Sequence, residues 1–158
     1  YVPLPFLRAK IDRAGLSENF IFYGQTTRGQ VHELLEKSHL HVVTSVSEGN
    51  PTTIWEAMSH GVPTLSVDHC GMHDSIQDDI GIRVPLADYP ELVLDFARRL
   101  ENVSARPQEL IEMAERVVYR AKEIHWDHRP AVFAQIYQKA IDNWRIRKNS
   151  GFVIEDPQ

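Results

Sequence analysis

The sequence has little of what several classes of protein need. Cys70 is the single cysteine among 158 residues, which excludes an internal disulfide or a site of several thiolates and favours a reducing compartment. No apolar run reaches the ~18 residues of a membrane helix, and the first residues do not resemble a signal peptide. We therefore expect a cytoplasmic protein without a membrane span.

Positive charge is scarce as well. The 17 lysines and arginines are outnumbered by 22 aspartates and glutamates, which gives a formal net charge of -5 at pH 7. A nucleic-acid-binding domain usually presents a basic face, so we expect no nucleic-acid partner. With 42% hydrophobic and 25% charged residues, the composition is that of an ordinary globular domain.

The chain lacks an initiating methionine, because it opens on Tyr1. We expect a piece of a longer protein, truncated at its N-terminus, in which residues 1–148 form one partial domain. Gly151 and Pro157 disfavour regular structure, so residues 149–158 are predicted to form a loosely ordered tail.

Short apolar runs alternate with helical patterns, which is the order expected of βαβ units in a parallel sheet. The predicted strands cover residues 20–23, 40–44 and 62–67, with a weaker edge strand at 82–84. Helical spacing of apolar residues occurs at 4–14, 29–38, 89–100, 108–124 and 126–147. These patterns predict an α/β fold, a Rossmann-like parallel sheet of about four strands flanked by helices.

The helix after the second predicted strand has the clearest boundaries. Asn50 is a suitable N-cap, Pro51 suits the first helical position, and Gly61 followed by Pro63 marks the end. In open parallel sheets, ligands bind beyond the carboxyl ends of the strands. We therefore expect ligand contacts in the loops at residues 24–27, 45–51 and 68–74.

The start of this helix is suited to an anion. The amides of Thr52 and Thr53 have no partner within the helix, and the helix dipole adds about half a positive charge there. Glu56 lies four residues after Thr52 on the same helical face, where a carboxylate can accept hydrogen bonds from sugar hydroxyls. Glu48 precedes the same amides. The alternative is that Glu56 is an ordinary helix residue and Glu48 a solvated loop charge.

Residues 48–58, Glu-Gly-Asn-Pro-Thr-Thr-Ile-Trp-Glu-Ala-Met, closely resemble the E-x(7)-E signature of the retaining nucleotide-sugar glycosyltransferases of family 4, also called group 1. Neighbouring segments agree in order and spacing. Residues 19–24 resemble the family's strand that ends in glycine, and residues 38–45 its next strand. Residues 61–64, 70–74 and 81–84 resemble its Gly-x-Pro, Gly-Gly-x-x-Glu and Gly-x-x-Val segments.

The resemblance implies the C-terminal, donor-binding half of a GT-B enzyme, a hexosyltransferase type that needs no metal or other cofactor. Its donor would be a nucleotide-diphospho-sugar, transferred with retention to a glycan, lipid or other acceptor. In that family the second glutamate, here Glu56, holds the ribose hydroxyls, and the first, here Glu48, lies near the donor sugar as a tentative catalytic residue. The donor-binding residues would be Gly24, Gln25, Gly49, Asn50, Pro51, Thr52, Thr53 and Glu56, with the loop at Gly24 and Gln25 near the base.

The same resemblance implies a partner segment, the acceptor-binding N-terminal domain, which would precede residue 1. Any peripheral membrane contact is expected only through that half, and residues 1–158 alone are expected to be inactive. Thr44, Cys70 and Asp74 depart from the residues usual at their positions in the family. The alternatives are a GT-B relative such as a nucleotide-sugar epimerase or phosphorylase, and a noncatalytic interaction module.

Two other patterns carry less weight. Residues 24–31 have the glycine spacing of a phosphate-binding Walker A loop but lack its lysine. Four aromatic residues at helical spacing predict one helix face that packs on a core or, where exposed, drives self-association: Trp126, Phe133, Tyr137 and Trp144.

Overall fold

The computed structural model describes residues 3–77 and 79–149. The chain divides into two compact units, Tyr1–Leu34 and Leu35–Gln158, which are described in turn. The prediction of one domain over residues 1–148 stays a prediction. Of the predicted tail, only Asn149 is described, as the last residue of a helix, and residues 150–158 lie outside the described residues.

The first unit contains α1 (Leu4–Arg13), the short 3-10 helix η1 (Ser17–Asn19) and the start of α2 (Arg28–Glu36). The strand predicted at residues 20–23 is wrong. These residues form no strand among the described residues of the chain, and Ile21 is 74% exposed. A strand needs a hydrogen-bonded neighbour, and none of the described strands pairs with this run. The rings of Phe20 and Phe22 instead stack at 6.5 Å, and the guanidinium group of Arg8 lies over the ring of Phe22.

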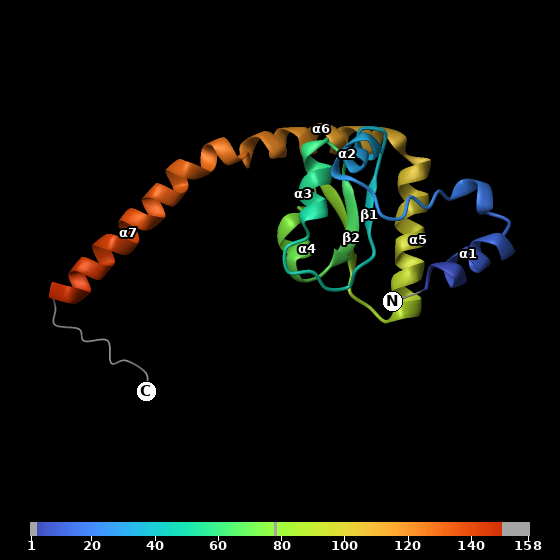
Figure 1. The fold of residues 1–158 in the computed structure, drawn as a ribbon, viewed down its shortest axis with the longest axis horizontal. Helices are drawn as coiled ribbons and strands as arrows, with labels where there is room; N and C mark the ends of the chain where they lie inside the picture. Colours follow the sequence, from blue (N-terminus) through green and yellow to red (C-terminus); the bar gives the residue numbers. More distant parts are fainter. Residues whose placement is uncertain (1–2, 78, 150–158) are drawn as a thin grey trace. The chain divides into compact units, whose positions relative to one another are not determined.

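The second unit is built on a parallel sheet of three described strands, β1 (His41–Val43), β2 (Thr64–Asp68) and β3 (Gly81–Pro85), in the order β1-β2-β3 (Figure 1). Thr64 is in register with His41 on one side and with Gly81 on the other. The predicted α/β class with a parallel sheet is confirmed, and so is β3 as an edge strand. The expected fourth strand was the run at residues 20–23.

The core lies around the central strand. Leu65 and Val67 of β2 are completely buried, as expected of a parallel strand covered on both faces. Ile54, Met72 and Val84 join them in one cluster, and Leu40 and Phe96 pack against it. Burial of each large apolar side chain stabilises the folded chain by roughly 1.5–3 kcal/mol. This packing holds the strands, and with them the loops that follow the strand ends.

The second unit also contains these helices: α3 (Thr52–Ser59), α4 (Cys70–Ser75), α5 (Tyr89–Ala105), α6 (Pro107–Glu123), the 3-10 helix η2 (Trp126–His128) and α7 (Arg129–Asn149). α3 and α4 pack on β2 and on each other, while α5 packs on β3. The predicted helices are present, and α4 is an addition, because most of the predicted loop at 68–74 is helical.

Two local sequence signals explain helix boundaries. Gly61 has φ +71°, its amide donates to Met58, and the amide of Val62 donates to Ala57, so α3 ends in the hydrogen-bond pattern that glycine favours. The carboxylate of Asp88 accepts the amide hydrogen of Glu91 at 3.0 Å and caps α5. α3 therefore ends, and α5 begins, where local chemistry predicts.

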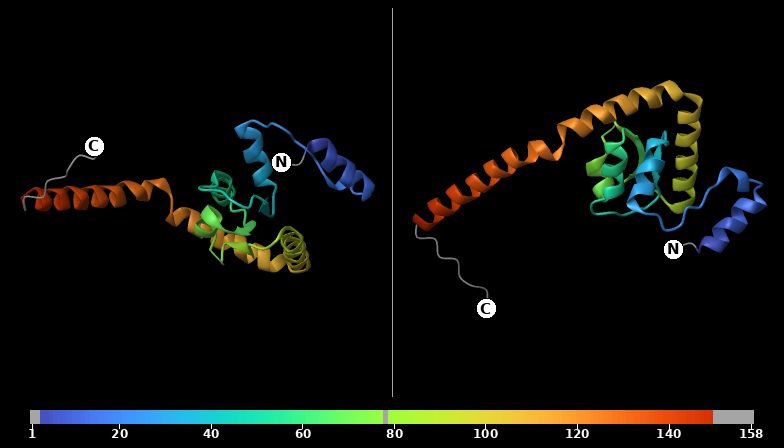
Figure 2. Two further views of the ribbon diagram at one scale, coloured as in Figure 1. Left: turned by 90° about the horizontal axis from the view of Figure 1, so that it is seen from below. Right: turned by 45° about the horizontal axis from the view of Figure 1, so that its top comes forward.

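The last helix packs less than its sequence predicts. No residue of α7 is buried, and Tyr137 and Trp144 are 66% and 57% exposed. Figure 2 shows α7 following α6 and η2 as a long helix. The prediction that its aromatic stripe packs on a core is therefore wrong for the residues described, because no described element covers that face. None of the helices in residues 3–77 and 79–149 has the combination of length and apolar character that a membrane span requires.

Candidate functional site

The loop between β1 and α3 meets the carboxyl edge of the sheet, where the sequence predicts a ligand. Asn50 does not cap α3, contrary to the prediction. Its side-chain oxygen instead accepts the indole N–H of Trp55 at 3.0 Å, and Pro51 occupies the N-cap position. No side chain among the described residues caps the first turn of α3, and Thr52 and Thr53 are exposed. The helix start is thus open to an anionic ligand.

Glu56 lies one turn into α3, half-buried, next to a histidine that sequence reasoning did not select. His41 of β1 is also half-buried, and its Nδ1 lies 3.1 Å from the hydroxyl oxygen of Thr64 on β2. Burial lowers the pKa of His41, and the neighbouring carboxylate of Glu56 opposes part of that shift. Burial thus disfavours the charged imidazole, and the carboxylate of Glu56 favours it.

Glu48 and Gly49 are held by the turn that follows β2. The amide of Gly71, the second residue of α4, donates a 2.8 Å hydrogen bond to the carbonyl oxygen of Glu48. A β-carbon at Gly71 would stand 2.7 Å from that oxygen and closer still to the carbonyl oxygen of Gly49. Cys70, before it, has a left-handed backbone with φ 48°, and its sulfur lies 3.7 Å from the hydroxyl of Ser47.

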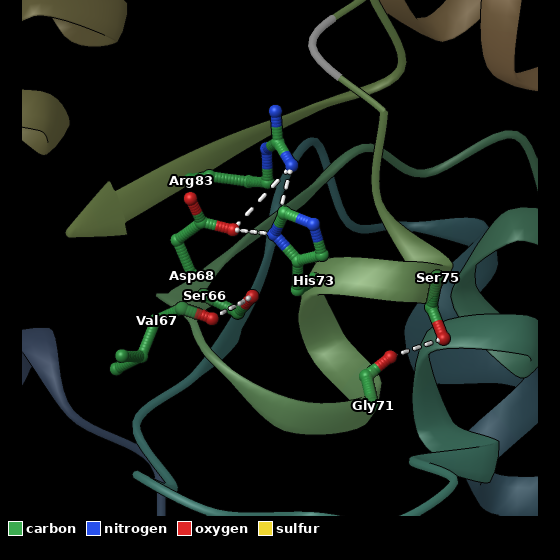
Figure 3. Close-up of polar contacts among 7 residues, drawn as sticks. All are labelled: Ser66, Val67, Asp68, Gly71, His73, Ser75 and Arg83. Atoms are coloured by element: carbon green, nitrogen blue, oxygen red, sulfur yellow. Dashed lines mark hydrogen bonds and ion pairs between the residues drawn. The ribbon is translucent and has the colours of Figure 1, made fainter. Parts of the chain in front are cut away.

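Three charged or polar side chains meet beside this turn (Figure 3). The Nδ1 atom of His73 on α4 lies 2.6 Å from Oδ1 of Asp68, the last residue of β2. Arg83 of β3 places a guanidinium nitrogen 3.4 Å from the same oxygen and 3.2 Å from the histidine nitrogen. The hydroxyl of Ser75 donates to the carbonyl oxygen of Gly71 at 2.6 Å and closes α4 on itself.

The predicted site residues thus fall in two groups. Those from Glu48 to Glu56 lie together at the start of α3 in the second unit. Gly24 and Gln25 lie in the first unit, where Gly24 has φ +66° and Gln25 is exposed. Among the described residues, no three histidine, cysteine or acidic side chains gather as metal ligands would. A cleft of about 640 Å³ lies at the other end of α3, between His60 and Lys122, and contains no predicted site residue.

Comparison with known proteins decides the family. The sequence profile described as "Glycosyl transferases group 1" matches residues 5–123, which include both glutamates and the turn at Gly71. The chain belongs to the group 1 glycosyl transferases. The resemblance read from residues 48–58 is confirmed.

Curated relatives of this group 1 chain agree with the family. It is 25% identical over 133 residues to a D-inositol 3-phosphate glycosyltransferase of Gordonia bronchialis, and 26% identical over 134 residues to one of Streptomyces bingchenggensis. Each match covers 84% of this chain. The chain spans 28% and 29% of the lengths of these two relatives.

A solved structure, titled "Crystal structure of GtfA/B complex", matches the fold with a TM-score of 0.73. The match has 18% sequence identity and covers 90% of this chain and 28% of the solved one. The group 1 chain therefore shares its fold with part of that structure.

Sequence reasoning missed three features of the site. The sequence did not identify His41 or His73 as site residues, because their contacts with Thr64 and Asp68 form only in the folded chain. The close approach of Gly71 to the Glu48 loop had a signal, the glycine at a position where the family pattern has one. The roles of the individual site residues stay predictions.

Proposed function

We propose that this chain is the donor-binding part of a retaining glycosyltransferase that uses a nucleotide-diphospho-sugar and transfers its sugar without a metal. The observation that carries the proposal is the match of a group 1 profile across the open start of α3 and both glutamates. Like the two inositol phosphate glycosyltransferases it resembles, it would be an enzyme domain, acting with an acceptor-binding domain. We assign it to the cytoplasm.

The chemistry of the α3 start supports this role. Exposed amides and the positive end of the helix dipole favour the charge that develops on a departing nucleoside diphosphate. The amides of Gly49, Asn50, Thr52 and Thr53 would meet the sugar and the diphosphate, with Pro51 fixing the turn. Stabilisation of the leaving group by fixed dipoles requires no metal ion, which agrees with the proposed metal-independent reaction.

The two glutamates take different roles in the proposal. Glu56 would accept hydrogen bonds from the ribose hydroxyls, and the burial of His41, which disfavours a charged imidazole, would leave the negative charge of Glu56 available. Glu48 would lie near the donor sugar and act as the catalytic carboxylate. Gly24 and Gln25 would contact the base.

An NMR titration of residues 1–158 with UDP, GDP and ADP tests donor binding. We expect one diphosphate to shift the amides of Gly49, Thr52 and Thr53. Glu56→Ala should weaken binding by roughly 1–3 kcal/mol, because two ribose hydroxyls lose their acceptor. Glu112→Ala, an exposed glutamate of α6, is the control and should not change affinity.

Silence with all three diphosphates would reject donor binding by this chain and favour a noncatalytic module. Residues 1–158 alone should transfer no sugar, because the proposed acceptor-binding domain is not among them. In the protein that carries both domains, the anomeric configuration of the product separates a retaining transferase from an inverting one, and release of free sugar phosphate would indicate a phosphorylase.

A further inference from the structure

We propose that the contact between His73 and Asp68 is a tether that positions Glu48 through the first turn of α4. The inference rests on the proposed donor site, because Glu48 is one of its residues. His73 is a positioning residue in this proposal and touches no donor atom. The tether links β2 to α4, and α4 in turn holds the loop that carries Glu48 (Figure 3).

The first step is the link from α4 to Glu48. The amide of Gly71 donates to the carbonyl oxygen of Glu48 at 2.8 Å, and Gly71 is buried against the backbone of Glu48 and Gly49. A displacement of the first turn of α4 therefore moves or releases the backbone of Glu48. The side chain of Glu48 follows its backbone.

The second step is that the first turn of α4 is strained and needs support. Only His69 separates β2 from α4, and the amide of His69 bonds back to the carbonyl oxygen of Val67 at 3.0 Å. Cys70 then adopts φ 48°, a left-handed conformation that is unfavourable for a residue with a side chain. Such a conformation persists where surrounding contacts hold it.

The third step is the chemistry of the support. At 2.6 Å, a hydrogen must lie between Nδ1 of His73 and Oδ1 of Asp68, because two facing lone pairs would repel each other. An ionised carboxylate only accepts hydrogen bonds, so Nδ1 carries the hydrogen and donates it. Because Nδ1 carries a hydrogen, it cannot accept another from Arg83, although a guanidinium nitrogen lies 3.2 Å away. The guanidinium group therefore pairs with the carboxylate of Asp68. Arg83 of β3 thus holds the carboxylate of Asp68, which accepts the hydrogen bond from His73 of α4.

The position of the tether also separates this role from core packing. Met72 in α4 and Ile76, the residue after α4, are 0% and 2% exposed and anchor the helix in the core. The side chain of His73, in contrast, is 58% exposed. Loss of the His73 contact should therefore leave the core intact. It should act on the turn that precedes Met72, at Cys70 and Gly71.

Hydrogen exchange of the Gly71 amide tests the tether, because this amide is the donor to Glu48. His73→Leu removes the donated hydrogen bond and should speed the exchange of Gly71 by about threefold to tenfold, a factor that lies between those of a typical exposed ion pair and of a charged hydrogen bond. His73→Asn keeps an N–H near the position of Nδ1 and should restore the slow exchange. His39→Leu, an exposed histidine outside the cluster, is the matched control.

Donor binding is measured on the same proteins with UDP-glucose, GDP-glucose or ADP-glucose, chosen by the diphosphate that the wild type binds, because Glu48 would lie near the donor sugar. We expect His73→Leu to weaken binding by a similar factor, while His73→Asn and His39→Leu stay within about twofold of the wild type. Unchanged Gly71 exchange in His73→Leu would overturn the tether whether or not nucleotides bind. Faster exchange with unchanged affinity would overturn its role in placing Glu48. If the wild type binds no diphosphate, the proposed function fails, and Gly71 exchange alone then decides the tether.

Discussion

Gly71 and Gly49 approach so closely that residue 71 has no room for a side chain. A β-carbon there would collide with the carbonyl oxygen of Gly49 and stand 2.7 Å from that of Glu48. Both obstacles are backbone atoms, which cannot rotate away. The contact therefore makes glycine a structural requirement at position 71.

Gly71→Ala should destabilise the protein although it places alanine in a helix. The helix preference of alanine contributes about 0.5–1 kcal/mol, and overpacking against backbone costs about 1–3 kcal/mol. We expect a net loss of about 1–2 kcal/mol in the free energy of urea unfolding. Gly49→Ala, on the other side of the contact, meets no atom within 4 Å and should unfold like the wild type. Equal effects of the two substitutions would contradict the collision.

Gly61→Ala should combine two penalties that a second substitution can separate. Its backbone has φ +71°, which costs alanine roughly 1–2 kcal/mol, and its β-carbon would stand 2.8 Å from Cγ2 of Val118 on α6. Val118→Ala removes the collision and leaves the backbone strain. In a double-mutant cycle of unfolding free energies, the double variant should be more stable than the sum of the single effects predicts. Additive effects would show that Val118 moves aside freely.

These two glycines also show what the sequence could predict. Gly61 follows a helix and precedes Pro63, so local rules identify its turn without knowledge of the fold. The close approach at Gly71 depends on a loop more than twenty residues away, and only the family pattern pointed to a glycine there. Apolar runs likewise predicted β1, β2 and β3, because a strand that packs in a sheet carries the necessary apolar residues in its own sequence.

The wrong or missed predictions concern residues whose contacts are made with distant parts of the chain, or whose side chain has two possible hydrogen-bond partners. Residues 20–23 have a strand composition, yet a strand forms only with a neighbour. Asn50 has the right chemistry for a cap, but the indole of Trp55 takes its oxygen. The approach of His73 to Asp68 depends on a left-handed Cys70, a conformation that no rule predicts for cysteine. The candidate site at the start of α3 was predicted, and the contacts that hold it were not.

His41 should make stability depend on pH. Burial lowers its pKa in the folded chain, so the folded state binds fewer protons than the unfolded state as pH falls below about 6.5. The contribution of His41 is therefore present above that pH and is lost progressively below it. We expect the loss of unfolding free energy between about pH 7.5 and about pH 5.5 to be smaller in His41→Leu.

The difference between the pH dependences of unfolding free energy in the wild type and in His41→Leu gives the contribution of His41. The other titrating groups contribute equally to both proteins, and the contact with Thr64 that the variant loses does not change with pH unless His41 titrates. An equal or steeper pH dependence in His41→Leu would contradict a lowered pKa. Replacement of Glu56 by glutamine should steepen the dependence, because its carboxylate favours the protonated imidazole.

The aromatic stripe of α7 should affect association and not folding. Tyr137 and Trp144 are exposed and touch neighbours on their own helix, since Tyr137 stacks with Phe133 and Lys148 lies over the ring of Trp144. The double variant Tyr137→Ser and Trp144→Ser should unfold within about 0.5 kcal/mol of the wild type. Sedimentation velocity should show less self-association, because the exposed apolar surface shrinks. Phe96→Ser, in an aromatic residue packed on the core, is the positive control and should cost about 3 kcal/mol. A comparable loss in the α7 variant would show that this helix packs on the rest of the protein.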